Sequence, residues 1–182
     1  MIKKLALIIG FIICLSSCGK DYVYRIEGEL SNLEDQTVYA VFEKDNYKVV
    51  DTVACTKPGQ FQIDQHEAGF HCVTIFFADK EHWVTAYLEP GETVKITGDA
   101  NSPLLLQVKG GRTNDKLTAF KKKIAPLLTE LTNLSNSLNS KDLNDTIEET
   151  DIAARLANVN MQLSEEAIRY VKENPDEEVS VV

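Results

Sequence analysis

Thiols and imidazoles are the side chains with the most reactive chemistry in this chain of 182 residues. The cysteines are Cys14, Cys18, Cys55 and Cys72. No two of them have the Cys-x-x-Cys spacing of a thiol–disulfide catalyst. The histidines, which are His66, His71 and His82, neither repeat at helical spacing nor stand beside cysteines at the spacing of a zinc site. We therefore expect no catalytic residue, no metal and no cofactor, and we predict that the chain is not an enzyme.

The N-terminal segment has the pattern of a bacterial lipoprotein leader. Lys3 and Lys4 precede an apolar run over residues 5–15, which as a helix would rise only about 16 Å, roughly half of the apolar core of a bilayer. Such a run is typical of a signal peptide rather than of a spanning helix. Leu15-Ser16-Ser17-Cys18 then follows the lipobox pattern, in which the thiol of the cysteine carries the lipid. We expect a signal peptide over residues 1–17 and lipid attachment at Cys18.

The residues after the cysteine predict where the protein is anchored. An aspartate directly after the cysteine would favour the inner membrane, and this chain has Gly19 there. We therefore expect a protein of the cell envelope, anchored to the outer membrane and facing an oxidising compartment. Only residues 19–21 separate Cys18 from the first expected strand, a reach of about 10 Å. The folded domain is expected to lie close to the membrane surface.

Charge and composition exclude nucleic acid and divide the chain. The net charge is −9, from 19 basic and 28 acidic residues, so nucleic acid is not an expected partner. All nine glycines lie at or before Gly111, in a segment whose composition favours strands and turns, whereas the segment after it favours helices. We expect a β-sandwich domain over residues 18–111, a helical hairpin over 112–174, and residues 175–182 as a tail or the start of a missing domain.

The alternation of apolar and polar residues predicts short strands in the first segment. They are expected at residues 22–30, 36–43, 48–55, 60–64, 70–77, 82–88, 93–97 and 104–108. Lys57-Pro58-Gly59-Gln60 and Glu89-Pro90-Gly91-Glu92 are expected turns, because proline presets the second position and glycine permits a positive φ at the third. The predicted fold class is α+β: an antiparallel β-sandwich or partly open barrel of seven or eight short strands, followed by a two-helix hairpin.

The second segment predicts two amphipathic helices. Thr113 or Asn114 is expected to cap the first helix, and Pro126 to kink it, because proline removes one backbone hydrogen bond. The polar run over residues 139–144 is the expected turn. The second helix is expected over residues 145–173, and Asn174-Pro175 stops it.

A register can be worked out around Cys55 and Cys72. If Pro58-Gly59 is the tip of one hairpin and the next loop is centred near Glu67, then Gln62 faces one cysteine on each side. The cysteines are then about 9.6 Å apart, too far for a disulfide, which predicts two thiols. The same register predicts a shared core face for Ala54, Phe61, Ile63, Val73 and Ile75. A Greek-key order would give these strands other neighbours.

Two further groups of residues suggest binding. Trp83 and Tyr87 are four residues apart on one expected strand and share a face. If they are exposed, they form a stacking platform for a ligand, and otherwise they are core aromatics. Lys121-Lys122-Lys123 would either touch anionic headgroups or form a solvated helix face.

Three motifs of the first segment resemble those of a known family. They are Val50-Asp51-Thr52, Pro58-Gly59-Gln60-Phe61-Gln62-Ile63 and Leu88-Glu89-Pro90-Gly91-Glu92-Thr93-Val94-Lys95-Ile96-Thr97-Gly98-Asp99. They are similar to those of a domain of unknown function that opens many bacterial lipoproteins whose C-terminal part is thioredoxin-like, of the thiol–disulfide oxidoreductase or peroxiredoxin type. The resemblance covers about residues 24–115, and the helical segment also fits it.

The resemblance implies a thioredoxin-like domain after the helices, with a catalytic Cys-x-x-Cys. The chain stops at Val182, just past Asn174-Pro175, so it is either truncated or a stand-alone relative. The Cys-x-x-Cys has no counterpart here, and no catalytic residue is carried over.

Three functions remain open at this point. The first is an accessory N-terminal region that positions the partner of a thioredoxin-like thiol–disulfide system. The second is a stand-alone envelope lipoprotein that binds a glycan or a peptide. The third, an enzyme of its own, is disfavoured because no catalytic constellation is present. A downstream reading frame with Cys-x-x-Cys would select the first, and exposure of Trp83 and Tyr87 would favour the second.

Overall fold

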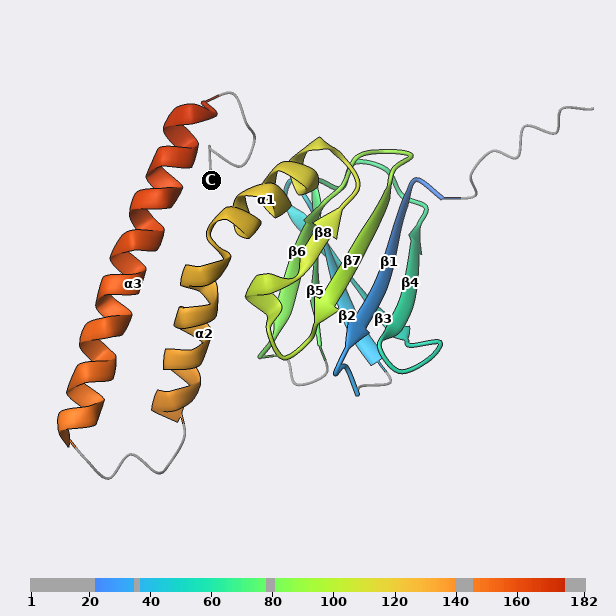
Figure 1. Ribbon diagram of the computed structural model, residues 1–182. Coiled ribbons are helices and arrows are strands. Elements are labelled where there is room, and N and C mark those ends of the chain that lie inside the picture. Colours follow the sequence, from blue (N-terminus) through green and yellow to red (C-terminus); the bar gives the residue numbers. More distant parts are fainter. Residues whose placement is uncertain (1–21, 35–36, 78–80, 140–145, 176–182) are drawn as a thin grey trace, which may run out of the picture.

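Strands and helices occupy the two segments as predicted in the computed structural model, which describes residues 22–34, 37–77, 81–139 and 146–175 (Figure 1). The described strands are β1 (Tyr24–Ser31), β2 (Thr37–Lys44), β3 (Tyr47–Ala54), β4 (Gln60–Gln65), β5 (Cys72–Phe76), β6 (Trp83–Tyr87), β7 (Thr93–Asp99) and β8 (Gln107–Lys109). The predicted strand over 104–108 is in part a short 3-10 helix, η1 (Pro103–Leu105). The predicted signal peptide, Cys18, residues 140–144 of the turn predicted over 139–144, and the tail after residue 175 lie outside the described residues, while Asn139 ends the helix before the turn.

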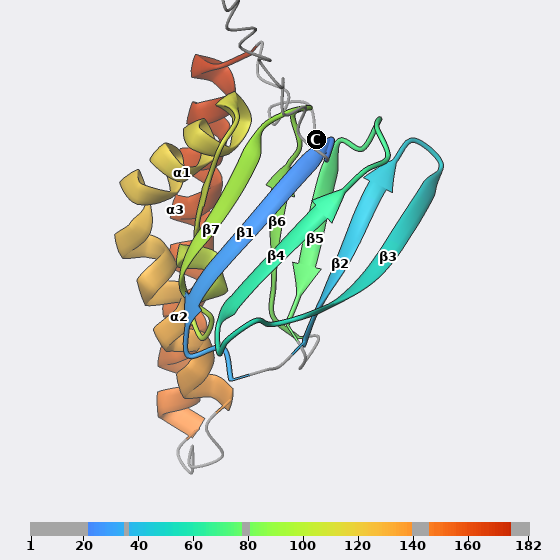
Figure 2. The ribbon, with the colours of Figure 1, turned by 90° about the vertical axis from the view of Figure 1, so that its right-hand side faces the viewer.

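The strands form a β-sandwich of two four-stranded sheets. The first sheet has the order β4-β1-β7-β8 and the second sheet the order β3-β2-β5-β6. Every pair of neighbours is antiparallel except β1 and β7, which are parallel, so the first sheet is mixed rather than purely antiparallel. Figure 2 shows the two layers, with the helices beside β7 and on the side of the sandwich opposite β3.

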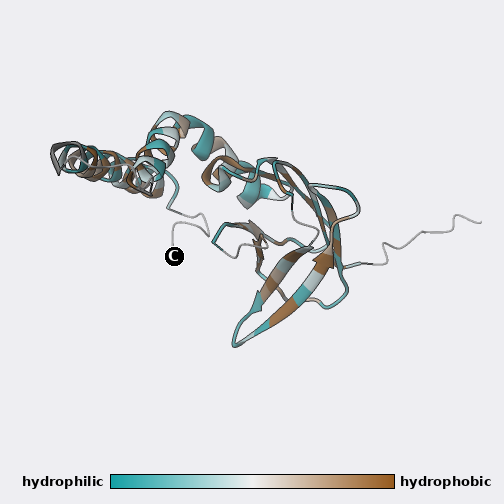
Figure 3. Cartoon of the chain, turned by 90° about the horizontal axis from the view of Figure 1, so that it is seen from below, coloured by the Kyte–Doolittle hydropathy of each residue, from teal (hydrophilic) through white to brown (hydrophobic). Residues whose placement is uncertain are grey.

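The core lies between the two sheets and follows the alternation of the sequence. On β1, Tyr24, Ile26 and Leu30 are buried. Hydrophobic residues line the strands of both sheets (Figure 3), because successive side chains point to opposite faces and only one face is covered. Each large aliphatic or aromatic side chain buried in this way contributes about 1.5–3 kcal/mol.

Gly28 is required by the packing of Phe61. The two residues face each other across β1 and β4, and the Phe61 ring lies over the glycine. A Cβ atom at position 28 would lie 2.2 Å from that ring. The missing side chain therefore creates the space in which Phe61 is buried.

Both predicted turns have the expected geometry. Gly59 has φ 75° and Gly91 has φ 81°, values that glycine adopts without strain. The amide of Gln60 donates to the carbonyl of Lys57 over 2.9 Å, which closes the first turn. The second turn is closed in the same way from Glu92 to Glu89, over 3.0 Å.

The predicted order of β3, β4 and β5 is wrong. Strand β4 pairs with β1 in the first sheet, where Gln62 faces Glu27, and β5 pairs with β2 and β6 in the second sheet. The chain crosses from one sheet to the other after β3, so consecutive strands are not neighbours. The predicted core residues Phe61, Ile63, Val73 and Ile75 are buried.

Ala54 is exposed rather than buried, and the next residue, Cys55, packs against the core. A shift of one residue inverts the two faces of a strand, which is why the prediction failed at this position. Cys72 follows the opposite alternation, with Val73 and Ile75 directed inward. The cysteines are on opposite faces of the second sheet with β2 between them, and the structure joins neither in a disulfide.

Three described helices follow the sandwich, where two were predicted. They are α1 (Arg112–Lys123), α2 (Ala125–Asn139) and α3 (Thr146–Glu173). The predicted helix is broken at Ile124 instead of only kinked, because Pro126, in the first turn of α2, cannot donate a hydrogen bond to the preceding turn. The residue that caps α1 is Gly111, with no side-chain capping bond, so the predicted cap at Thr113 or Asn114 is wrong.

The two long helices pack against each other as an antiparallel pair. Their shared core is made by Leu134 on α2 with Ile152 and Val159 on α3, all of them buried. Arg155 donates to Glu130 over 3.1 Å across this pair. Figure 1 shows that the pair stands beside the sandwich, to which it is joined by α1.

Candidate functional site

Trp83 and Tyr87 lie on β6 and point away from the sandwich core. The residues between them alternate, with Val84 and Ala86 buried and Thr85 exposed. The side chain of Trp83 is 53% exposed, and that of Tyr87 is half-buried. They share a face, as predicted, and that face is the outer one, but Thr85 lies between them, and four residues of strand span about 13 Å. They do not form one contiguous stacking surface.

Trp83 instead forms a row with two aromatic residues from other strands. Strand pairing places Tyr39 opposite Phe76, and Phe76 opposite Trp83. The rings of Phe76 and Trp83 are 6.1 Å apart between centroids, at an interplanar angle of 39°. We call Tyr39, Phe76 and Trp83 the aromatic row. It crosses β2, β5 and β6 at right angles to the strands and spans about 9.6 Å between its end strands.

The neighbouring row on the same face is small and uncharged. It runs from Val50 through Val41 and Thr74 to Thr85. Val50 is 63% exposed, and the hydroxyls of Thr74 and Thr85 are 3.1 Å apart. The aromatic row therefore borders a surface of methyl and hydroxyl groups.

A third row on this face contains a pair of opposite charges. It contains Lys48, Glu43, Cys72 and Tyr87. Lys48 donates a hydrogen bond to Glu43, which raises the pKa of the lysine. These two charges are therefore paired with each other on this face.

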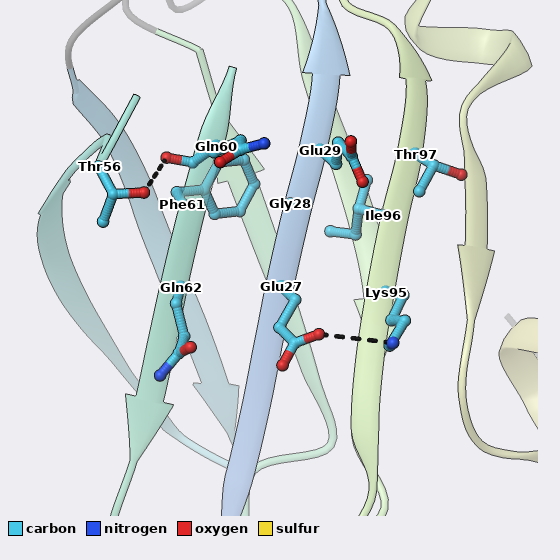
Figure 4. A pocket seen from close by; sticks show the side chains of 10 residues that line it. All are labelled: Glu27, Gly28, Glu29, Thr56, Gln60, Phe61, Gln62, Lys95, Ile96 and Thr97. Carbon is cyan, nitrogen blue, oxygen red and sulfur yellow. Dashed lines mark hydrogen bonds and ion pairs between the residues drawn. The ribbon is translucent and has the colours of Figure 1, made fainter. Parts of the chain in front are cut away.

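The outer face of the first sheet is polar. A cavity of about 300 Å³ lies on this face, and Glu27, Gln62 and Lys95 are among the residues that line it (Figure 4). The ammonium of Lys95 is 3.7 Å from a carboxylate oxygen of Glu27, a pair that Figure 4 shows across β1 and β7. Most of the lining side chains are polar, and Phe61 and Ile96 are the large apolar ones among them, whereas small-molecule sites are lined predominantly by apolar side chains.

An ion pair extends this polar face. Arg25 donates two hydrogen bonds to Asp64, each of 2.7 Å, and its guanidinium carbon lies 4.0 Å from the ring centroid of Tyr22. The bond from Arg25 lowers the pKa of Asp64 below its usual range. Because Arg25 and Asp64 form a salt bridge with each other, neither charge is directed at a ligand.

Asn114 and Thr118 connect α1 to the edges of both sheets. The amide of Asn114 accepts from the backbone N–H of Tyr87 over 2.9 Å and donates to its carbonyl over 2.7 Å. The Thr118 hydroxyl makes the same two bonds to the backbone of Val108, at 3.1 and 2.5 Å. These side chains take the place of a neighbouring strand on β6 and β8, so α1 closes this side of the sandwich. Both residues are buried, and sequence reasoning missed their role.

The described residues contain no cluster that could hold a metal ion. Within residues 22–34, 37–77, 81–139 and 146–175, no three His, Cys, Asp or Glu side chains gather as a metal site would require. His71 is exposed and lies 3.3 Å from Asp45 in a surface pair. None of the described helices is both long and apolar enough to cross a membrane.

The aromatic row contains two residues that the sequence analysis did not select. Tyr39 and Phe76 lie on predicted strands, but 37 positions separate them in the chain, and only the pairing of β2 with β5 brings them together. Their outward direction follows from alternation with buried Val38 and Ile75. Alternation could have placed both on an outer face, but it could not have placed them beside Trp83.

Comparison with known proteins identifies the family of the sandwich. The model of a family described as a domain of unknown function, DUF4369, matches residues 24–117. That range is more than half of the chain and covers every strand and the first half of α1. No curated protein and no solved structure matches the chain. The chain therefore belongs to the DUF4369 family, which is defined by a domain of unknown function.

Proposed function

We propose that this protein is a non-catalytic binding module of the cell envelope, and that its ligand, a glycan or a peptide, binds to the aromatic row. One observation carries the proposal: Trp83, at the open end of the row, is 53% exposed. A sheet that only needed one covered face would present polar side chains there. An exposed aromatic side chain with two neighbours in line is instead typical of a contact surface.

The surroundings of the aromatic row favour an uncharged ligand. Its bordering row offers hydroxyls from Thr74 and Thr85 and the methyl groups of Val41 and Val50. Such a surface stacks on the apolar side of a sugar ring or a proline and hydrogen-bonds to its polar groups. A strongly charged ligand would find no uncompensated charge there, since Lys48 and Glu43 are paired.

Lipid attachment at Cys18 is the second part of the proposal. The leader and Leu15-Ser16-Ser17-Cys18 support it. In the bacterial host, Cys18→Ser is expected to leave an unprocessed precursor, because the cysteine is the residue that receives the lipid. Immunoblotting of membrane and soluble fractions measures this. A mature-sized Cys18→Ser band in the membrane fraction would contradict the lipobox.

The ligand test uses the single tryptophan of the chain. Titration of the full chain with chitohexaose, cellohexaose or a proline-rich decapeptide is expected to change the Trp83 emission for at least one of the three. Calorimetry then compares the wild type with Trp83→Ala and Phe76→Ala, each expected to weaken binding about tenfold or more, which is the loss of one stacking contact.

Tyr47→Ala is the matched control for these variants. Tyr47 is 45% exposed and lies on the second sheet, but its ring contacts Phe70 instead of the aromatic row. Its loss is expected to leave affinity unchanged. Binding that survives both Trp83→Ala and Phe76→Ala would exclude the aromatic row as the ligand site.

The accessory role in a thioredoxin-like system is the second candidate function. The family resemblance supports it, and so does an apolar strip on α3: Met161 and Ile168 are 55% and 54% exposed. Val159 on the opposite side of α3 is buried against α2, so the strip faces away from the helix pair. Sequencing of the gene beyond codon 182 tests this candidate. A frame that encodes Cys-x-x-Cys supports it, and a stop codon there argues for the binding module alone.

A further inference from the structure

A cavity of about 240 Å³ lies where the helices meet the sandwich. It is lined by η1, β8, the last turn of α1 and the first turns of α2. Leu105, Leu106 and Ala125 form apolar walls, and Gln107 and Lys121 contribute polar side chains. None of the residues that line the cavity belongs to the aromatic row.

Lys121 is the unusual residue of this cavity. Its side chain is half-buried, and burial lowers the pKa of its ammonium group. Among the described residues, no carboxylate pairs with Lys121 and no acceptor takes a hydrogen bond from its ammonium. By contrast, Lys123 in the same run lies 3.7 Å from Glu166.

An unpaired charge in such a place is unfavourable. Removing an ammonium from water has a cost that is normally offset by an opposite charge or by hydrogen bonds. The chain has 28 acidic residues against 19 basic ones, yet it directs none of the described carboxylates at Lys121. An anion supplied from outside would give the lysine its missing partner.

The size and walls of the cavity restrict that anion. Pockets for drug-sized ligands enclose about 300–1,000 Å³, so a cavity of about 240 Å³ holds a smaller molecule. The apolar walls from Leu105, Leu106 and Ala125 would cover a short hydrocarbon chain, and Gln107 has an amide that can donate to an oxygen. A bare inorganic anion would leave these walls without contacts.

We propose that this cavity binds a small carboxylate with a short apolar tail, whose carboxylate pairs with Lys121 while its tail contacts Leu105, Leu106 and Ala125. Lys121 then acts as the residue that selects a charged ligand, and the leucines select the tail. The site is independent of the aromatic row, so either proposal can fail alone.

The experiment is an NMR titration of the full chain with sodium hexanoate. Shift changes are expected for the amides of Leu106 and Ala125, with saturation. Hexanamide has the same tail without the charge, and acetate has the charge without the tail. Each is expected to bind about tenfold more weakly than hexanoate, because one half of the contact is missing.

Variants assign the effect to Lys121. Lys121→Met and Lys121→Gln are expected to lower the affinity for hexanoate about tenfold. Lys109→Met is the matched control, since Lys109 is an exposed lysine outside the cavity lining, to which Lys122 belongs together with Lys121, and Trp83→Ala is the control for the other proposed site. Both controls are expected to bind hexanoate like the wild type.

The proposal fails on any of three results. No saturable shift at Leu106 and Ala125 would mean that the cavity takes no such ligand. Equal affinity for hexanoate and hexanamide, or full affinity in both Lys121 variants, would mean that the lysine only packs its stem on the cavity wall and extends its ammonium to water.

Discussion

The outer faces of the two sheets of the sandwich differ in what they present to water. The first sheet presents charged residues in pairs, such as Arg25 with Asp64 and Glu27 with Lys95. The second sheet presents the aromatic row and Val50. In both sheets one side is buried and the other faces water, so polar side chains are expected on both outer faces. Only the first face presents mainly polar side chains to water.

The two outer faces differ in whether their residues support the fold or favour contact with another molecule. Paired surface charges contribute little to stability, but they keep a sheet soluble and give its strands a register. Exposed aromatic and β-branched residues contribute no burial and favour association. The second sheet therefore carries an unfavourable surface without a gain in folding, which is why we place the proposed ligand site there.

The largest expected effect comes from the contact that joins the edges of both sheets to α1. Asn114→Ala leaves the buried backbone groups of Tyr87 and the carbonyl of Gly110 without the bonds that Asn114 makes to them. The free energy of unfolding is expected to fall by about 3 kcal/mol, measured by urea denaturation.

Asn133→Ala is the control for this prediction, because Asn133 is exposed on α2. It is expected to change stability by less than about 0.5 kcal/mol. If Asn114→Ala changed the free energy of unfolding as little as the control, the bonds from α1 to the sandwich would not stabilise the fold.

A smaller, pH-dependent effect is expected on the polar face. The pKa of Asp64 is lowered in the folded state, chiefly by Arg25. Its stabilisation is therefore complete above the ordinary carboxyl range, near pH 4 and higher, and is lost as the pH falls through the lowered pKa. Asp64→Asn is expected to be less stable than the wild type at pH 7 and equal to it in strong acid.

Glu92→Gln serves as the reference in the same pH series, since Glu92 is an exposed carboxylate outside the Arg25–Asp64 pair. Its stability is expected to follow the wild type at every pH. A constant difference between Asp64→Asn and the wild type, from neutral to acid pH, would show that the Arg25–Asp64 pair is not what orders the polar face.

The smallest effect on stability is expected from substitutions that give one outer face a residue typical of the other. Val50→Thr on the second sheet and Thr97→Val on the first are swaps of similar shape at exposed positions. Each is expected to change the free energy of unfolding by less than about 0.5 kcal/mol. Binding of a hydrophobic dye should fall for Val50→Thr alone, because Thr97 stands among charged neighbours and its replacement creates no apolar patch. Equal dye binding by both variants would contradict the difference between the faces.

Local features of this fold could be predicted because their causes are local. Alternation placed the strands to within a few residues, and the two proline-glycine turns closed as expected, since a turn needs only four neighbouring residues. The last helix was expected over 145–173 and is observed at Thr146–Glu173. The break near Pro126 was predicted as a kink, because whether a proline kinks a helix or ends it depends on what the helix packs against.

Features that depend on strand neighbours could not be predicted. Asn114 has the residue type of a helix cap, but in the fold it lies beside the open edge of β6, and its amide bonds there instead. Ala54 was placed in the core by a hairpin between β3 and β4 that does not exist. The Ala54 error arose because the partner strand was taken from the nearest sequence, and the Asn114 error because a helix cap depends only on the first turn, whereas this side chain bonds to a strand distant in the sequence.

The sequence alone determined which residues can alternate, turn and coil, and it also determined the expected leader, which lies outside the described residues. The tertiary structure decided which strands are neighbours, and so it alone assembled Tyr39, Phe76 and Trp83 into one row and left Lys121 in a cavity without a carboxylate. The reason is physical: dihedral preferences and side-chain alternation act over a few residues, whereas strand order results from burying two whole faces against each other.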